Sequence, residues 1–231
     1  MGAWFMNSDG ATGETDRCDG GSEDLTVSAA DTIPTSASVP TGYSGASRNF
    51  EFTEIDYMHV ADGGTTDVTG AEQGLTICAW VDLEDTTVDG YVISKWSTGV
   101  VNERQYLLKY ESSTSSMEVR ISSDGTTTND ITVTGSDDVT SGFHHACGVH
   151  DPVNNLVLLY VDGYEDNTGA WTLGVGVTNS DADFRIGTAE TDTRPWDGLI
   201  DEVIVLDRVL TASEVLGLFT NGIDGSKGAN D

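Results

Sequence analysis

The sequence predicts an all-β protein, an antiparallel sandwich or barrel with one short C-terminal helix. Three observations predict this fold class. Short runs rich in β-branched and aromatic residues recur between turn residues from Arg48 onward. About eleven such runs follow one another without the helical patterns that would separate the strands of a βαβ protein. The 231 residues are also enough for one domain of this kind to bury a core.

The predicted strands share alternating or continuous apolar positions bounded by Gly, Asn, Asp or Ser. They are 49–52, 56–61, 75–83, 91–96, 105–110, 117–122, 131–134, 143–150, 156–162, 184–187 and 199–206. The run 198–206 is apolar on both alternations, which is typical of a strand covered on both faces. Asp201 interrupts it. Because a buried carboxylate needs partners, we expect Asp201 to accept backbone N–H groups or to touch a structural cation.

Local signals predict one hairpin and one helix. Asp162-Gly163 between two strand-like runs suits the two positive φ angles of a type I′ turn, so the chain should reverse there. A helix is expected over 212–219. Thr211 and Glu214 have capping-box spacing, Leu210 and Val215 can form a hydrophobic staple, and Gly222 follows the end.

The composition divides the chain into three parts. Residues 1–45 are rich in Gly, Ser, Thr and Asp, and we expect an N-terminal arm there, ordered by what it lies against. Trp4, Phe5 and Met6 would anchor it. The sandwich is expected over 46–222, followed by a C-terminal tail over 223–231.

Acidic residues dominate the charge: 39 Asp and Glu against 10 Lys and Arg give −29. This excludes a nucleic-acid interface of basic patches and electrostatic attraction to anionic lipid. Molar salt, with a Debye length of about 3 Å, would screen the mutual repulsion. The composition therefore favours a protein of a halophile, with an acidic mesophilic surface protein as the alternative.

Segments that direct export or membrane insertion are not visible in the sequence. Residues 1–6 lack the basic region and the apolar run of a signal peptide. No stretch approaches the ~18 apolar residues of a membrane helix. We therefore expect no membrane insertion, and any export to proceed without a visible signal.

Cys18, Cys78 and Cys147 form an odd, sparse set, which does not suggest a disulfide framework. Cys78 and Cys147 each lie in the middle of a predicted strand, where we expect them to pack as small apolar residues. Without a C-x-x-C motif or a Cys/His cluster, the sequence indicates no structural zinc.

Several runs, taken in order, resemble the laminin G-like family of the concanavalin A-like superfamily. They are LTICAWV (75–81), GYVISK (90–95), FHH (143–145), LYVDG (159–163), FRIG (184–187), DGLIDEV (197–203) and LTASE (210–214). Each run is short, but their order and spacing are specific. The resemblance covers roughly 48–220 and implies a two-sheet antiparallel sandwich of the concanavalin A-like jelly-roll type.

Glucanases of this superfamily carry acids at alternate positions of one strand, and Glu54-Ile-Asp56 resembles the beginning of such a motif. The next acid is missing, because Met58 and His59 follow Asp56. Retaining hydrolysis needs two carboxylates about 5–5.5 Å apart. We therefore expect the protein not to be an enzyme.

The resemblance to pentraxins, relatives within this fold, implies a cation site. The counterparts of the pentraxin ligands are Asn102 and Glu103 in one loop and Glu190 and Asp192 in another. Oxygen ligands from two neighbouring loops suit Ca²⁺, which takes six to eight of them. In so acidic a chain, solvated acidic loops are the alternative.

Three tryptophans near predicted loops, Trp96, Trp171 and Trp196, are candidates to stack on a sugar ring. Their alternative role is packing under those loops. Trp80 lies within a strong strand and is expected in the core.

These observations favour a non-catalytic virion surface protein of a halophile's virus, such as a capsid decoration, turret or fibre component. A surface-type jelly roll that starts from its own methionine, without a leader and with an assembly arm, motivates this prediction. The expected partners are other virion subunits, copies of itself in a homo-oligomer, and host cell-surface glycans. The alternative is a glycan-binding module of a secreted or envelope protein, with a glucanase relative as a third class. The expected location is the virion surface or the extracellular space.

Overall fold

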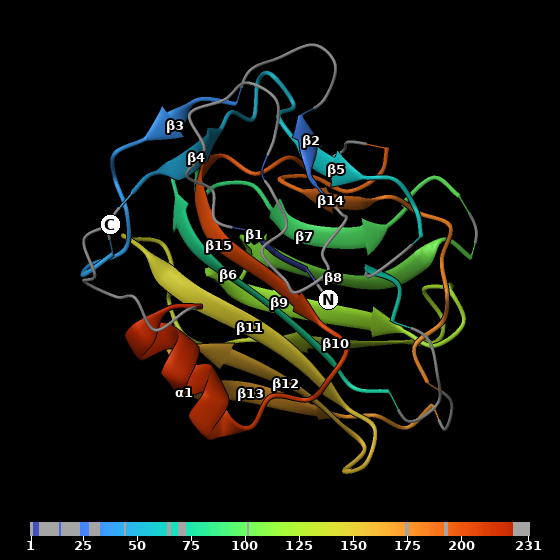
Figure 1. Cartoon of the computed structure of the whole chain (residues 1–231). Coiled ribbons are helices and arrows are strands. Elements are labelled where there is room, and N and C mark those ends of the chain that lie inside the picture. The colour runs from blue at the N-terminus through green and yellow to red at the C-terminus, as the bar shows by residue number, and fades with distance from the viewer. Residues whose placement is uncertain are drawn as a thin grey trace.

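The computed structural model describes residues 2–4, 14, 24–27, 33–43, 45–63, 66–68, 73–100, 102–173, 176–191 and 194–223. Within these ranges the chain forms fifteen strands and one helix, and the strands build two antiparallel sheets packed face to face (Figure 1). The predicted all-β sandwich with a short C-terminal helix is confirmed.

The first sheet has eight strands. Its order is β13 (Tyr164–Ala170), β12 (Leu156–Val161), β11 (His144–Asp151), β6 (Leu75–Leu83), β15 (Gly198–Leu206), β4 (Ser47–Phe50) and β3 (Thr35–Ser36), with β1 (Gly2–Trp4) also paired to β15. The pairing of β15 with β6 shifts between Asp201 and Ile204, and Glu202 has a φ of 45° there. At this bulge the Asp201 carboxylate accepts the Glu202 N–H at 2.8 Å, as expected of a buried acid.

The second sheet has seven strands. Its order is β10 (Asp130–Thr134), β9 (Ser116–Ser122), β8 (Arg104–Glu111), β7 (Gly90–Trp96), β14 (Phe184–Ile186), β5 (Met58–Val60) and β2 (Thr26–Val27). The apolar core lies between this sheet and the first. Strand β6 shows how it is filled: Ile77, Ala79 and Val81 point inward and are 0–2 % exposed. Its alternate residues point outward, because successive side chains of a strand face opposite sides.

Helix α1 (Ala212–Asn221) covers part of the outer face of the eight-stranded sheet, where Figure 1 shows it beside β11 to β13. The predicted capping box is confirmed: the Glu214 N–H donates to Thr211 Oγ1 and the Thr211 N–H donates to Glu214 Oε2. Leu210 and Val215 share one apolar cluster with the outer face of the sheet. No helix in the described ranges is long and apolar enough to span a membrane.

The hairpin between β12 and β13 turns at Asp162 and Gly163, whose φ angles are 50° and 82°. This confirms the predicted reversal. Strand β13 itself was not predicted, because Tyr-Glu-Asp-Asn-Thr-Gly-Ala has no apolar alternation. It is an edge strand with most of its side chains exposed, so its pairing with β12 fixes it rather than burial.

The described parts of residues 1–45 lie on the sandwich of the same chain. Leu25 and Ile33 are 1 % exposed and belong to the main core. The buried Arg48 guanidinium pairs with Glu14 at 2.7 Å and donates to the Ile33 carbonyl oxygen. Of the expected anchor, the backbone of Trp4 lies in β1, whereas Phe5, Met6 and the tail beyond residue 223 fall outside the described residues. The division into arm, sandwich and tail stays a prediction.

Candidate ligand-binding site

A cavity of about 480 Å³ opens on the outer side of the eight-stranded sheet, next to the last turn of α1. Its lining residues are Thr41, Trp80, Asp82, Gly142, Phe143, Asp162 and Phe219, and we call it the aromatic pocket. They come from the loop before β4, from β6, from the loop before β11, from the β12–β13 turn and from α1. Segments far apart in the sequence thus meet at one end of the sheet.

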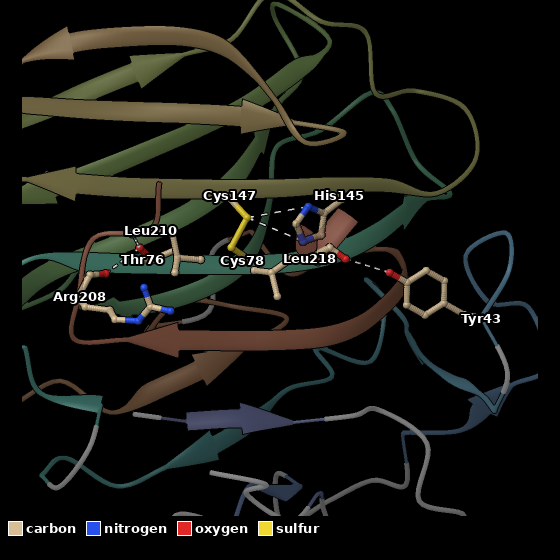
Figure 2. The surroundings of a disulfide bond; sticks show 8 residues. All are labelled: Tyr43, Thr76, Cys78, His145, Cys147, Arg208, Leu210 and Leu218. Carbon is tan, nitrogen blue, oxygen red and sulfur yellow. Dashed lines mark hydrogen bonds between the residues drawn. A yellow bond between two sulfur atoms is a disulfide. The ribbon is translucent and has the colours of Figure 1, made fainter. Parts of the chain in front are cut away.

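The wall of the aromatic pocket is a cluster of packed rings. The Trp80 ring stacks on Phe219 with centroids 5.4 Å apart, and the Tyr43 ring meets Trp80 edge-on at 5.3 Å. Figure 2 shows the Tyr43 hydroxyl donating to the Leu218 carbonyl oxygen, at 3.2 Å. This bond ties the loop before β4 to the end of the helix. Rings held by packing on several sides give the pocket a preformed wall.

A disulfide lies beneath this wall. Cys78 of β6 and Cys147 of β11 are directly opposite each other in the two paired strands and are bonded (Figure 2). The expectation that they pack as small apolar residues is therefore wrong. Sequence could not reveal the bond, because it depends on the register of two strands 69 residues apart. His145 Nε2 lies 3.8 Å from Cys147 Sγ, and burial lowers the pKa of His145 to about 4.

The two carboxylates of the pocket have different environments. Asp162 is held by two hydrogen bonds, one with His144 Nδ1 at 2.9 Å and one from the His145 N–H at 2.9 Å. Burial alone would raise its pKa, but these bonds and the nearby imidazoles lower it. The bond to Asp162 in turn raises the pKa of His144. Asp162 therefore stays ionised and positions the hairpin.

Asp82 is different, because its carboxylate forms no hydrogen bond or ion pair within the described ranges. It is half-buried at the end of β6, and burial raises its pKa against the opposing effect of His144. Its oxygens are free to accept hydrogen bonds from a ligand. Trp80 and Asp82 reach the pocket together because they are two residues apart on the outward face of β6.

The sequence analysis missed this site. It placed Trp80 in the core. Trp80 is indeed buried, at 4 % exposed, but it lies on the outer face of the sheet and lines the pocket. The signal was present: Trp80 and Asp82 fall on the opposite alternation from Ile77, Ala79 and Val81. What the sequence could not show is that a loop and a helix end would wall off the space above them.

The three tryptophans predicted to stack on a sugar are buried. Trp171 and Trp196 are 4 % and 0 % exposed and belong to the main core. Trp96, 2 % exposed, lies on the outer face of the seven-stranded sheet beneath Arg120 and Arg104, at 5.3 and 6.0 Å from its ring centroid. Their role in binding stays a prediction, and the described structure gives them packing partners.

The two loops predicted to hold Ca²⁺ lie side by side. The Ser97 N–H donates to the Glu103 carbonyl oxygen at 2.6 Å, and the Glu190 N–H donates to the Trp96 carbonyl oxygen at 3.1 Å. The Glu103 carboxylate accepts a bond from the Ser180 hydroxyl at 3.3 Å. Asn102 is exposed, and Asp192 lies outside the described residues, so the calcium site stays a prediction.

The acids that resemble a glucanase motif do not share a strand. Glu54 is exposed in a turn, whereas Asp56 is 1 % exposed and accepts the Glu51 N–H at 3.1 Å. Strand β5 begins only at Met58. Alternate positions along a strand would have presented both acids on one face.

Known proteins of similar structure share this sandwich. The binding domain of Paraclostridial Mosquitocidal Protein 1 superposes with a TM-score of 0.71 at 11 % identity, and the match covers 94 % of this chain and 51 % of that one. The present chain therefore spans about half the length of that domain. Domain 4 of AbnA, an extracellular GH43 arabinanase from Geobacillus stearothermophilus solved with arabinotriose, gives 0.69 at 16 % identity, covering 94 % of this chain and 96 % of that one. A heptameric SAP-like pentraxin from Limulus polyphemus gives 0.53 at 19 % identity, with 69 % and 75 % covered.

Among curated protein sequences, no match was found. The family model Laminin_G_3, described as "Concanavalin A-like lectin/glucanases superfamily", matches residues 53–216. The matched segment runs from the turn before β5 into α1 and includes the eleven strands β5 to β15. The chain therefore belongs to the Laminin_G_3 family of the concanavalin A-like superfamily, as the sequence motifs indicated.

Proposed function

We propose that the protein is a non-catalytic, lectin-like module that binds carbohydrate, and that the aromatic pocket is its binding site. One observation carries the proposal: the pocket combines aromatic rings with a carboxylate that has no hydrogen-bond partner in the described ranges. The rings are complementary to the apolar face of a sugar, and the carboxylate is complementary to its hydroxyl groups.

A pyranose or furanose has an apolar C–H face and a rim of hydroxyl groups. Phe143 and Phe219 are partly exposed, so their rings can pack against the C–H face. Asp82 can accept hydrogen bonds from hydroxyl groups at the rim. A volume of 480 Å³ lies within the roughly 300–1,000 Å³ typical of small-molecule pockets.

Two acids in one pocket also raise the question of hydrolysis, because glycosidases use a carboxylate pair. Asp162 has both of its oxygens engaged by His144 and by the His145 N–H. A carboxylate held in this way supports the hairpin and is poorly placed to attack a sugar or activate a water. This favours binding without turnover.

The neighbouring structures support the proposal. Domain 4 of the arabinanase was solved with arabinotriose. The ligand-binding domain of botulinum neurotoxin serotype D was solved with N-acetylneuraminic acid, and the chain matches 50 % of that domain with a TM-score of 0.66 at 10 % identity. Both share this sandwich and were solved in complex with a sugar.

We further propose that the protein works outside the cytosol, and we keep the virion surface of a halophile's virus as its specific location. The Cys78–Cys147 bond supports the first part, because disulfides persist in oxidising surroundings. The charge of −29 supports the halophilic host. The heptameric pentraxin supports a homo-oligomer. Copurification with virus particles tests the location.

A glycan microarray probed with the purified protein tests the binding function. We expect binding to a defined set of glycans, and about a tenfold loss in Phe143→Ala, which removes one stacking ring. Phe52→Ala is the matched control, because Phe52 is exposed but lies outside the pocket. The proposal is wrong if no glycan binds, or if both variants bind like the wild type.

An assay with the bound glycans tests the absence of catalysis. We expect no release of reducing sugar. Turnover that disappears in Asp82→Asn would make the protein an enzyme and Asp82 its acid.

A further inference from the structure

The aromatic pocket carries negative charge that its own residues do not neutralise. Asp82 and Asp162 both line it, and among the lining residues that the structure describes there is no Lys or Arg. His144 pairs with Asp162, at 2.9 Å. Asp82 is left without an ion pair in the described part of the chain, half-buried and with its pKa raised by burial. A carboxylate that has lost solvent without gaining a cation is stabilised by any cation that enters.

The same pocket offers aromatic rings next to this charge. The lining residues include Trp80, Phe143 and Phe219, and the rings of Trp80 and Phe219 are stacked on each other. The faces of such rings attract organic ammonium groups, most strongly when the site is shielded from water. Rings and an unpaired carboxylate in one cavity are therefore complementary to an ammonium group on an organic ligand. An acidic sugar would meet two carboxylates and the field of a chain with −29.

We propose that the aromatic pocket selects sugars that carry a protonated amino group, with the ammonium group at Asp82 and the sugar ring against Phe143 and Phe219. The inference rests on the proposed carbohydrate-binding function and specifies its ligand class. We therefore expect this chain to prefer cationic sugars to acidic sugars such as N-acetylneuraminic acid.

Three oligosaccharides with one backbone isolate the charge. β-1,4-linked oligomers of glucosamine, N-acetylglucosamine and glucose differ only at C2, where they carry an amine, an acetamide or a hydroxyl. Titration calorimetry is done at about pH 6, where an amine of this kind is protonated. We expect the glucosamine oligomer to bind about tenfold more tightly than the other two. Choline chloride, a simple ammonium ion, is expected to bind at least about tenfold more weakly than the glucosamine oligomer, because it lacks the sugar ring.

Two variants that remove the same charge separate the pocket from the general field of the protein. Asp82→Asn should bring the three oligomers to the same affinity. Asp181→Asn, at an exposed site in the loop before β14, should keep the preference for glucosamine. Melting curves of both variants confirm that they are folded.

Four other outcomes would contradict the inference. Equal binding of the three oligomers by the wild type overturns the inference but keeps the proposed function. A preference that Asp181→Asn reduces as much as Asp82→Asn overturns it as well, because the effect is then a general one of charge. Choline binding as tightly as the glucosamine oligomer overturns the assignment to a sugar. If no oligomer binds and the microarray is also negative, the proposed function fails and the inference fails with it.

Discussion

The outer faces of the two sheets both carry tryptophan and charged residues, but they differ in how the charges are balanced. On the seven-stranded sheet, Trp96 packs with Tyr91, Leu107 and Ala189 beneath two arginines. Arg120 pairs with Asp130, and Lys109 lies within 4 Å of Asp89, Glu111 and Glu118. On the eight-stranded sheet, the aromatic pocket has two acids and one imidazole partner. Charges that pair with one another, as on the seven-stranded sheet, leave no charged group for a ligand. An unpaired carboxylate beside aromatic rings, such as Asp82, can bind one.

On the outer face of the eight-stranded sheet, the largest effect on stability is expected from removing the Cys78–Cys147 disulfide. In the chain-entropy picture, closing a loop of 69 residues stabilises the fold by about 4 kcal/mol. The double variant Cys78→Ala/Cys147→Ala should therefore lose about 2–4 kcal/mol in a urea unfolding curve. Val153→Ala, which shortens a side chain that is 79 % exposed, is the control and should unfold like the wild type. An unchanged midpoint in the double variant would show that the pocket face does not depend on this bond.

Acid should weaken the fold through two buried imidazoles, His145 beside the pocket and His150 in the core. The pKa of His145, lowered to about 4 by burial, lies below the ordinary value of 6.5, and His150 in the core is alike. The unfolded chain therefore binds protons between pH 6.5 and 4 that the folded chain does not. Stability contributed by these neutral rings is present above that window and is lost as the pH falls through it, by roughly 2–3 kcal/mol for each ring.

Variants assign this loss to its residues. His145→Phe and His150→Phe should each flatten the fall of the melting temperature between about pH 7 and pH 4.5, whereas His144→Phe should not, because the pKa of His144 is raised in the folded chain. A slope that is the same in all three variants would place the loss elsewhere in the chain.

On the seven-stranded sheet, Lys109→Met should cost about 2 kcal/mol, because it leaves several acids without their shared cation. Lys109 is 3 % exposed, with its Nζ 2.6 Å from Glu111 and 3.2 Å from Asp89. The figure is below that of a fully buried pair, since water reaches the carboxylates. Arg194→Met removes the same charge from a half-exposed partner of Asp89 and should cost less than about 0.5 kcal/mol. Equal losses in a chemical denaturation experiment would mean that this face is not a specific network.

Salt should have the smallest effect, and it tests the whole surface. Between about 0.1 and 2 M KCl, screening weakens the paired charges of one sheet but also the repulsion among the many unpaired acids. With a net charge of −29 the second effect should prevail, so the melting temperature should rise by a few degrees, about 1 kcal/mol. A flat or falling melting temperature would contradict the prediction of a halophilic host.

The features that the sequence predicted depend on neighbouring residues. The capping box at Thr211 and Glu214, the turn at Asp162-Gly163 and the alternation of β6 each need only a few consecutive positions. The family resemblance then gave the fold. Strand β13, with its polar residues, was missed because its partner β12 defines it.

The site depends on residues that the fold brings together. Trp80 and Phe219 are 139 positions apart in the sequence, and their contact exists only because α1 folds back over the outer face of β6. The tryptophans predicted to lie exposed near loops, such as Trp196, are instead buried in the core. Burial by a segment distant in sequence has no local signature, which is why the fold was predictable and the pocket was not.

The position of the disulfide also bears on how the sheet is assembled. Cys78 and Cys147 face each other only in the native pairing of β6 with β11. A slip by one residue would turn one of the two side chains to the opposite face of the sheet, where it could not reach its partner. The disulfide can therefore form only when these two strands are paired in their native register. Once formed, the bond prevents the central pair of the sheet from sliding, and Trp80 and His145, two residues further along the same strands, keep their places opposite each other.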